Sequence, residues 1–93
     1  ALDSLIRLSK SLKDTSRANL YDEICVTAFN VEPKISVEYA NKLIQFANTA
    51  STQKYAVRGN EVIGIYHFIN TNLDSSLFYF EKAKINCDSM QAD

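Results

Sequence analysis

Residues 77–83 read LFYFEKA, and residues 37–43, which read VEYANKL, repeat their helical phase. A shift of 40 residues brings the two runs into register without a gap and extends over about two dozen positions. Four pairs of positions carry identical residues: Asn30 and Asn70, Ser36 and Ser76, Tyr39 and Tyr79, and Lys42 and Lys82. Each copy spans two helical segments and one turn. The chain is therefore predicted to contain two helical hairpins, whose apolar faces are buried when the hairpins stack.

The composition favours an all-α chain. Only two glycines and one proline occur in 93 residues, whereas turn-rich β architectures usually need more of both. No stretch approaches the ~18–20 apolar residues of a membrane span, so we expect no direct membrane insertion by this segment. Ten basic residues face eleven acidic ones, and no basic stripe is present. Nucleic acid is therefore not an expected partner.

Hydrophobic periodicity predicts five helices, which cover about residues 3–12, 16–30, 33–49, 55–70 and 74 to 87 or beyond. Pro33 ends the second helix and suits the first turn of the third. The polar residues 48–54 form the longest expected loop. We predict a single domain over residues 1–93, as a fragment of a longer protein. Its expected parts are a leading helix (1–13), a first hairpin (14–53) and a second hairpin (54–93).

The second copy resembles a tetratricopeptide repeat. Ile63 and Gly64 stand at the Leu-Gly pair of the family pattern, and Ser76, Phe80 and Ala83 take its later small, aromatic and small places. In such a repeat the glycine lets the partner helix approach closely, and the aromatic ring fills the gap between the small residues. The resemblance implies an all-α, right-handed α-solenoid of antiparallel hairpins, preceded here by a leading N-terminal helix.

Both copies depart from the family pattern. Asn60 stands where the family prefers a large apolar residue, and His67 stands where it prefers tyrosine. In the first copy Ile24 replaces the glycine, Ala40 the aromatic residue and Leu43 the small one. The period of 40 residues also exceeds the usual ~34 of the family. The resemblance is therefore to a long-period variant.

Residues 14–20, which read DTSRANL, suggest a narrower resemblance. Together with the preceding helix, they are similar to the opening of the tetratricopeptide sensor regions of Gram-negative bacterial histidine kinases and helix-turn-helix regulators. In such proteins this region is exported and precedes a membrane helix. The resemblance implies the N-terminal sensor or interaction segment of a larger signal-transduction or transcription-regulatory protein, with a periplasmic location favoured. A cytoplasmic peptide-binding regulator of the same fold is the first alternative, and a helical enzyme or cofactor-binding bundle is an alternative of another class.

The resemblance also implies a binding surface, because the first helix of each hairpin lines the concave groove in this family. The exposed stripe predicted on this basis comprises Tyr21, Cys25, Ala28, Phe29, Arg58, Glu61, Ile65, Phe68 and Ile69. A further repeat, the leading helix or a second chain could cover this apolar stripe; alternatively, the stripe binds an apolar peptide. We expect a protein or peptide partner. We also expect self-association, as a homodimer, through this stripe or through the apolar surface around Leu77, Tyr79 and Phe80.

No constellation typical of catalysis, of a cofactor site or of a metal site is found. His67 is the only histidine, and its mid-helix position favours a packing role over a Ser-His-acid or Cys-His arrangement. Cys25 and Cys87 form no Cys-x-x-Cys pair, so we expect no zinc site. Two free thiols are the favoured interpretation, and a disulfide remains the alternative. We therefore predict a protein that is not an enzyme and binds no cofactor.

Overall fold

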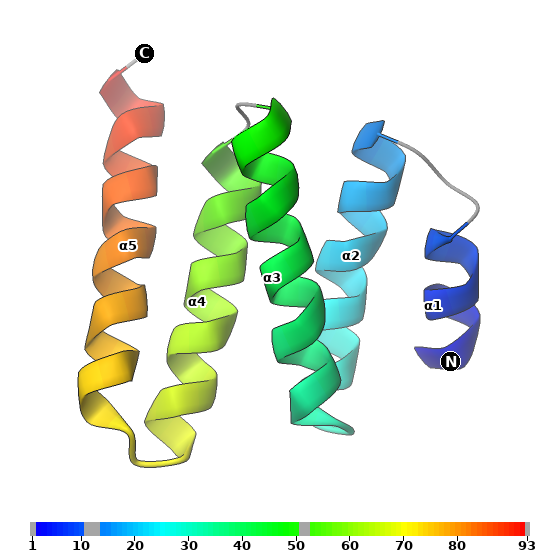
Figure 1. Cartoon of the computed structure of the whole chain (residues 1–93), viewed down its shortest axis with the longest axis horizontal. Helices are drawn as coiled ribbons and strands as arrows, with labels where there is room; N and C mark the ends of the chain where they lie inside the picture. Colours follow the sequence, from blue (N-terminus) through cyan, green and yellow to red (C-terminus); the bar gives the residue numbers. More distant parts are fainter. Residues whose placement is uncertain (1, 11–13, 51–52, 93) are drawn as a thin grey trace.

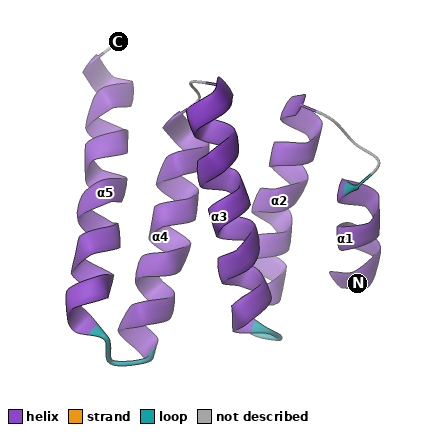
Figure 2. Ribbon diagram, viewed as in Figure 1, coloured by secondary structure: helices purple, strands orange, loops and turns teal. Residues whose placement is uncertain are grey.

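The computed structural model describes residues 2–10, 14–50 and 53–92. The described part of the chain consists of helices joined by short turns and has no strand (Figure 2). Its five helices are α1 (Leu2–Ser9), α2 (Asp14–Ala28), α3 (Pro33–Ala50), α4 (Gln53–Ile69) and α5 (Leu73–Ala92). The prediction of an all-α chain is therefore confirmed.

The helices stand side by side in chain order, from α1 at one end to α5 at the other (Figure 1). Each helix packs against the next one in the sequence, and α2 also contacts α4. The array is flat, since its principal extents are 34 × 34 × 15 Å. The contact between α2 and α4 brings the first helices of the two hairpins together.

Part of the predicted loop is helical. The loop was expected over residues 48–54, but α3 continues to Ala50 and α4 begins at Gln53. Residues 48–50 and 53–54 include neither glycine nor proline, so nothing in them prevents the two helices from extending into the predicted loop. The last helix extends beyond residue 87 to Ala92, as its prediction allowed, and the first ends at Ser9. The predicted end of the first helix, Leu12, lies outside the described residues.

The core lies between α2, α3 and α4. Ile24 of α2, Leu43 of α3 and Ile63 of α4 are among its largest side chains, and each is at most 2% exposed. Tyr39 and Tyr55 are also buried in this cluster. Burial of a large aliphatic side chain contributes about 1.5–3 kcal/mol, so these three helices supply most of the hydrophobic stabilisation.

One hydrogen bond recurs in the turns of the two hairpins. The N–H of Val31 donates a hydrogen bond to the carbonyl of Ala28 at 3.0 Å, and 40 residues later the N–H of Thr71 donates to the carbonyl of Phe68 at the same distance. The backbone conformations of the two turns differ, because Thr71 has a positive φ and Val31 does not.

The repeated serines tie the two helices of each hairpin together. Ser36 Oγ donates to the carbonyl oxygen of Cys25 at 2.7 Å, and Ser76 Oγ donates to the carbonyl oxygen of Gly64 at 2.9 Å. Both serines are buried, and both bonds run from the second helix of a hairpin to the first. A small residue at this position brings the helices close, and its hydroxyl finds a buried acceptor.

The repeated tyrosine and lysine residues form a second matching pair of contacts. Lys42 Nζ lies 5.6 Å from the ring centroid of Tyr39, and Lys82 Nζ lies 5.5 Å from that of Tyr79. A lysine at this distance from an aromatic ring makes a cation–π contact that contributes about 0.5–1 kcal/mol when exposed. The second helix of each hairpin therefore carries the same contact between a tyrosine and the lysine one turn later.

Asn60, which departs from the family pattern, is buried between α4 and α5. It is 2% exposed, and its Nδ2 donates to Asn86 Oδ1 at 2.9 Å. Asn86 Nδ2 in turn donates to Gln53 Oε1 at 2.9 Å. The Oδ1 atom of Asn60 is enclosed and has no hydrogen-bond partner. A short chain of carboxamides thus replaces apolar packing at this interface.

Candidate functional site

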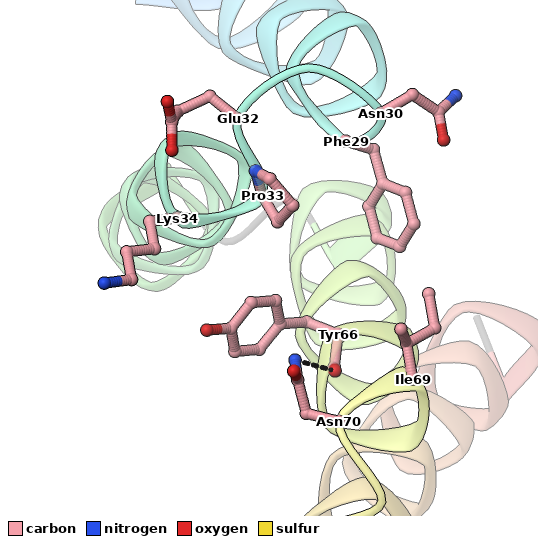
Figure 3. Close-up of a pocket in the computed structure, with 8 residues that line it drawn as sticks. All are labelled: Phe29, Asn30, Glu32, Pro33, Lys34, Tyr66, Ile69 and Asn70. Carbon is pink, nitrogen blue, oxygen red and sulfur yellow. Dashed lines mark hydrogen bonds between the residues drawn. The ribbon is translucent and has the colours of Figure 1, made fainter.

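A hollow of about 430 Å³ opens between the α2–α3 turn and the C-terminal end of α4 (Figure 3). The residues that line it are Phe29, Asn30, Glu32, Pro33, Lys34, Tyr66, Ile69 and Asn70. Because α2 and α4 are the first helices of the two hairpins, the hollow lies on the face where the resemblance implies binding. Its volume is within the range typical of ligand sites.

The inner walls of this hollow are apolar. The side chain of Phe29 points from the turn toward Ile69 and Tyr66 of α4 (Figure 3). Asn70 Nδ2 donates to the carbonyl oxygen of Tyr66 at 2.8 Å, which caps the end of α4 beside the hollow. The side chain of Asn30 points away from the hollow. The hollow can therefore accept an apolar group between polar residues at its rim.

A second hollow, of about 230 Å³, adjoins the first and shares Phe29 and Asn30 with it. Its other lining residues are Cys25, Val26, Arg58, Val62 and Ile65. We call the two hollows together the α2–α4 groove. Val26 is 53% exposed, Ile65 40% and Ile69 61%, so the groove offers apolar surface to solvent along much of its length.

An ion pair lies beside the second hollow. Arg58 Nε is 2.7 Å from Asp22 Oδ1, and both side chains are more than one third exposed. Solvent screening limits an exposed pair of this kind to about 1 kcal/mol or less. The pair joins α2 to α4. It helps to fix the spacing of the two helices and adds little to the stability of the fold.

Four residues of the predicted stripe line the α2–α4 groove at exposed or half-buried positions: Phe29, Arg58, Ile65 and Ile69. Two others were expected to be exposed but are not. Cys25 forms part of the groove wall and Ala28 does not, and both are 0% exposed. Their predicted exposure is wrong, because the contact of α2 with α3 and α4 covers this side of the helix.

The remaining stripe residues lie elsewhere. Tyr21 packs toward α3, where its ring centroid is 5.4 Å from that of Tyr39 in an edge-to-face arrangement. Glu61 and Phe68 are exposed on α4 but line neither hollow. The sequence-based stripe is therefore divided among three surfaces.

Val26, Val62 and Tyr66 line the groove but are not part of the predicted stripe. Val26 lies in the last turn of α2, and Phe29 follows it three residues later in the turn. Large apolar residues at this spacing, next to the predicted stripe, were the signal that could have revealed this side.

The wall of the groove includes one buried thiol, that of Cys25. Burial raises the pKa of the Cys25 thiol to about 12, with a smaller effect in the same direction from the Asp22 carboxylate, while Arg58 lowers it. This thiol is therefore protonated at neutral pH and is a poor nucleophile. Both cysteines are free thiols. Within the residues that the structure describes, no three His, Cys, Asp or Glu side chains could hold a metal ion.

His67 packs among aromatic rings at the α4–α5 interface. Its ring is stacked on that of Tyr79, with centroids 5.6 Å apart and planes 17° apart, and it meets the ring of Tyr66 edge to face. The packing interpretation of His67 agrees with this geometry. No helix of the described ranges is long and apolar enough to cross a membrane.

No protein-family model matches the chain, and no curated protein or solved structure is similar to it. The all-α architecture therefore comes from the structure, and the resemblance to tetratricopeptide repeats depends on the chain's own residues and geometry.

Proposed function

We propose that the chain is a tetratricopeptide-like scaffold for protein–protein interaction. Two hairpins, α2–α3 and α4–α5, would stack as a right-handed α-solenoid, with α1 as a leading helix. The repeated turn hydrogen bond, the repeated serine bond and the repeated tyrosine–lysine contact support this assignment. Because side-chain contacts recur at the same spacing as the backbone turns, a true structural repeat is favoured over a chance helical bundle.

The proposed role of the α2–α4 groove is to hold an apolar segment of a protein partner. The observation that carries this proposal is the pair of adjoining hollows, whose walls combine Phe29 with the exposed side chains of Val26, Ile65 and Ile69. Transferring one such side chain of a partner out of water gains about 1.5–3 kcal/mol. Several anchors along one groove would give a specific complex of moderate affinity.

Charged residues at the rim of the groove would determine which partner sequence binds more than how tightly it binds. Glu32 and Lys34 stand beside the first hollow and carry opposite charges. Neither forms an ion pair with another described residue, so each is open to a charged group of a partner. In the larger protein, we propose that this segment is the N-terminal sensor or interaction part of a bacterial signalling or regulatory protein.

Peptide selection with a matched pair of variants tests the groove. Peptides selected from a random displayed library on the whole chain would be remeasured by titration calorimetry with Ile69→Asp and Ile85→Asp. These isoleucines are 61% and 64% exposed, but only Ile69 lines the groove. Ile69→Asp should weaken binding at least about tenfold, and Ile85→Asp should leave it unchanged. If both variants bind equally well, the groove is not the site.

A further inference from the structure

The outer side of the second hairpin exposes a row of large side chains. Phe68 of α4 is 60% exposed, and on α5 Leu73 is 62%, Leu77 59% and Phe80 38% exposed. The exposed Lys84 continues the row along α5, one turn beyond Phe80. We call these five residues the terminal face.

The first hairpin shows how such a face is covered. Ala28 and Ala40 correspond to Phe68 and Phe80, and both are 0% exposed. Val37, which corresponds to Leu77, is half-buried and packs against the core. The cover is α4, which packs along α3 and also reaches α2. Under the internal repeat, the terminal face therefore corresponds to the surface of the first hairpin on which another helix packs.

An acidic row runs beside the terminal face. Asp74, Glu81 and Asp88 are spaced seven residues apart, so they lie on one side of α5 at intervals of two turns. All three are exposed. Within the described part of the chain none of the three makes an ion pair, and the ion pair found there joins Arg58 to Asp22. A helix docked on the terminal face would have these carboxylates along one edge.

We propose that the terminal face docks an amphipathic helix of a different protein, with an apolar row facing Leu77 and Phe80 and with basic residues along one flank. The acidic row argues against an antiparallel pairing with a second copy of this chain. In an antiparallel pair of α5 helices, residues on the same flank of the apolar seam face each other. Such a pair would place the acidic row of one copy against that of the other, and this repulsion disfavours the antiparallel homodimer.

Two designed peptides test the charge requirement. Both are helical peptides of about 18 residues with a leucine and alanine row, one with lysine and the other with glutamate at every seventh position on one flank. Fluorescence anisotropy would measure binding to the whole chain. The lysine peptide should bind at least about tenfold more tightly at low salt, and its advantage should shrink at about 0.3 M salt. Equal binding of the two peptides would refute the proposal.

Matched variants locate the site and exclude the second copy. Leu77→Asn should abolish binding of the lysine peptide, whereas Ile85→Asn, at a similarly exposed position outside the terminal face, should not. The triple variant Asp74→Asn, Glu81→Gln and Asp88→Asn should remove the preference between the two peptides. Circular dichroism would show that each variant is folded. A dimer in sedimentation experiments that Leu77→Asn dissociates, or peptide binding that survives Leu77→Asn, would overturn the proposal.

This site is separate from the α2–α4 groove. Ile69→Asp changes the groove and should leave the lysine peptide bound with unchanged affinity. Loss of binding in this variant would show that the peptide occupies the groove, and the terminal face would then not be the docking site.

Discussion

A Cβ atom on Gly59 would lie 2.6 Å from the carbonyl oxygen of Ala40. It would also lie 2.7 Å from Cγ1 of Ile44. The backbone of α3 and the side chain of Ile44 thus occupy the space that the side chain of any other residue at position 59 would need. Close approach of α3 and α4 therefore depends on Gly59, although the family resemblance singled out Gly64.

We predict that Gly59→Ala lowers the free energy of unfolding. Alanine gains about 1 kcal/mol in helix propensity, but overpacking against a backbone carbonyl costs about 1–3 kcal/mol and forces α3 away from α4. Urea denaturation followed by circular dichroism would measure the change. A Gly59→Ala variant that is more stable than the parent chain would show that the two helices separate at little cost.

Gly64→Ala is the matched control. Its Cβ would lie 2.9 Å from Cε1 of Phe80, the far end of a side chain that is 38% exposed and free to turn toward solvent. We therefore expect Gly64→Ala to change stability by less than about 1 kcal/mol. Gly64→Leu needs more room than this ring can give, so it should destabilise the chain. If Gly64→Leu instead raises the melting temperature, the close contact of Gly64 with Phe80 is unimportant.

Thr71 is expected to be a site of stored strain. Its φ is 60°, and it is the one non-glycine residue with positive φ among those the structure describes. The N–H of Asn72 donates to the carbonyl of His67 at 2.8 Å, which completes a Schellman motif with Thr71 at the left-handed position. A β-branched residue is costly there, so Thr71→Gly should raise the free energy of unfolding by about 1 kcal/mol.

Val31 provides the control, since it occupies the equivalent place in the first turn without a positive φ. There, Val31→Gly should lower stability by a few tenths of a kcal/mol to about 1 kcal/mol, because glycine only increases the freedom of the unfolded chain. Thermal melts of both variants would show the opposite signs. A stabilising Val31→Gly would mean that the turns do not differ as described.

Asn60→Leu should stabilise the chain by about 1–2 kcal/mol. The substitution removes a buried carboxamide whose Oδ1 has no partner, and it keeps a similar volume. Asn86 loses one bond but is half-buried and keeps its bond to Gln53. Asn60→Asp is the contrasting variant: it would bury a carboxylate and should unfold at a lower urea concentration at pH 7 than at pH 4. Destabilisation by Asn60→Leu would show that the carboxamide chain specifies the interface.

The two cysteines should differ in reactivity. Cys25 is fully buried with its thiol pKa raised to about 12, whereas Cys87 is half-buried. We expect Ellman's reagent at pH 8 to modify one thiol quickly in the folded chain and both in urea. Cys87→Ser should abolish the fast reaction. Fast modification of the Cys87→Ser variant would contradict the burial of Cys25.

Burial of Cys25 also predicts a dependence of stability on pH. Its thiol pKa is about 12 in the folded chain against an ordinary value of 9.0, so the folded state favours the protonated form. The contribution is fully present below pH 9 and is lost as the pH rises from 9 toward 12. The parent chain should therefore lose more stability than Cys25→Ala between pH 8.5 and about pH 10.5, as measured by urea denaturation.

The sequence predicted the helices and the repeat well, because both depend on local spacing. Ser36 and Ser76 were aligned by the 40-residue shift, and the structure gives each a buried hydrogen bond to the preceding helix, with acceptors, Cys25 and Gly64, that differ by one position in the repeat. Phe80 was expected to fill a gap, and its ring does lie against the position of Gly64, but it remains 38% exposed. Its removal should therefore cost less than the ~3–5 kcal/mol of a fully buried phenylalanine.

The binding surface was harder to predict, because it depends on how α2 is rotated about its own axis relative to α4. Tyr21 and Asp22 are neighbours in the sequence, yet Tyr21 packs toward α3 and Asp22 pairs with Arg58 of α4. Periodicity identifies an apolar face but does not say which neighbour covers it. The role of Gly59 was missed for the same reason, since its contact is with the preceding hairpin.

The order of the helices in Figure 1 bears on how fast the molecule folds. Within the described residues, most helix contacts join neighbours in the chain. Contact order is therefore low, and topologies of this kind fold in microseconds to milliseconds. Helix α1 stands at one end of the row and packs mainly against α2, so its amide protons should exchange with solvent first, well before those of α3 and α4.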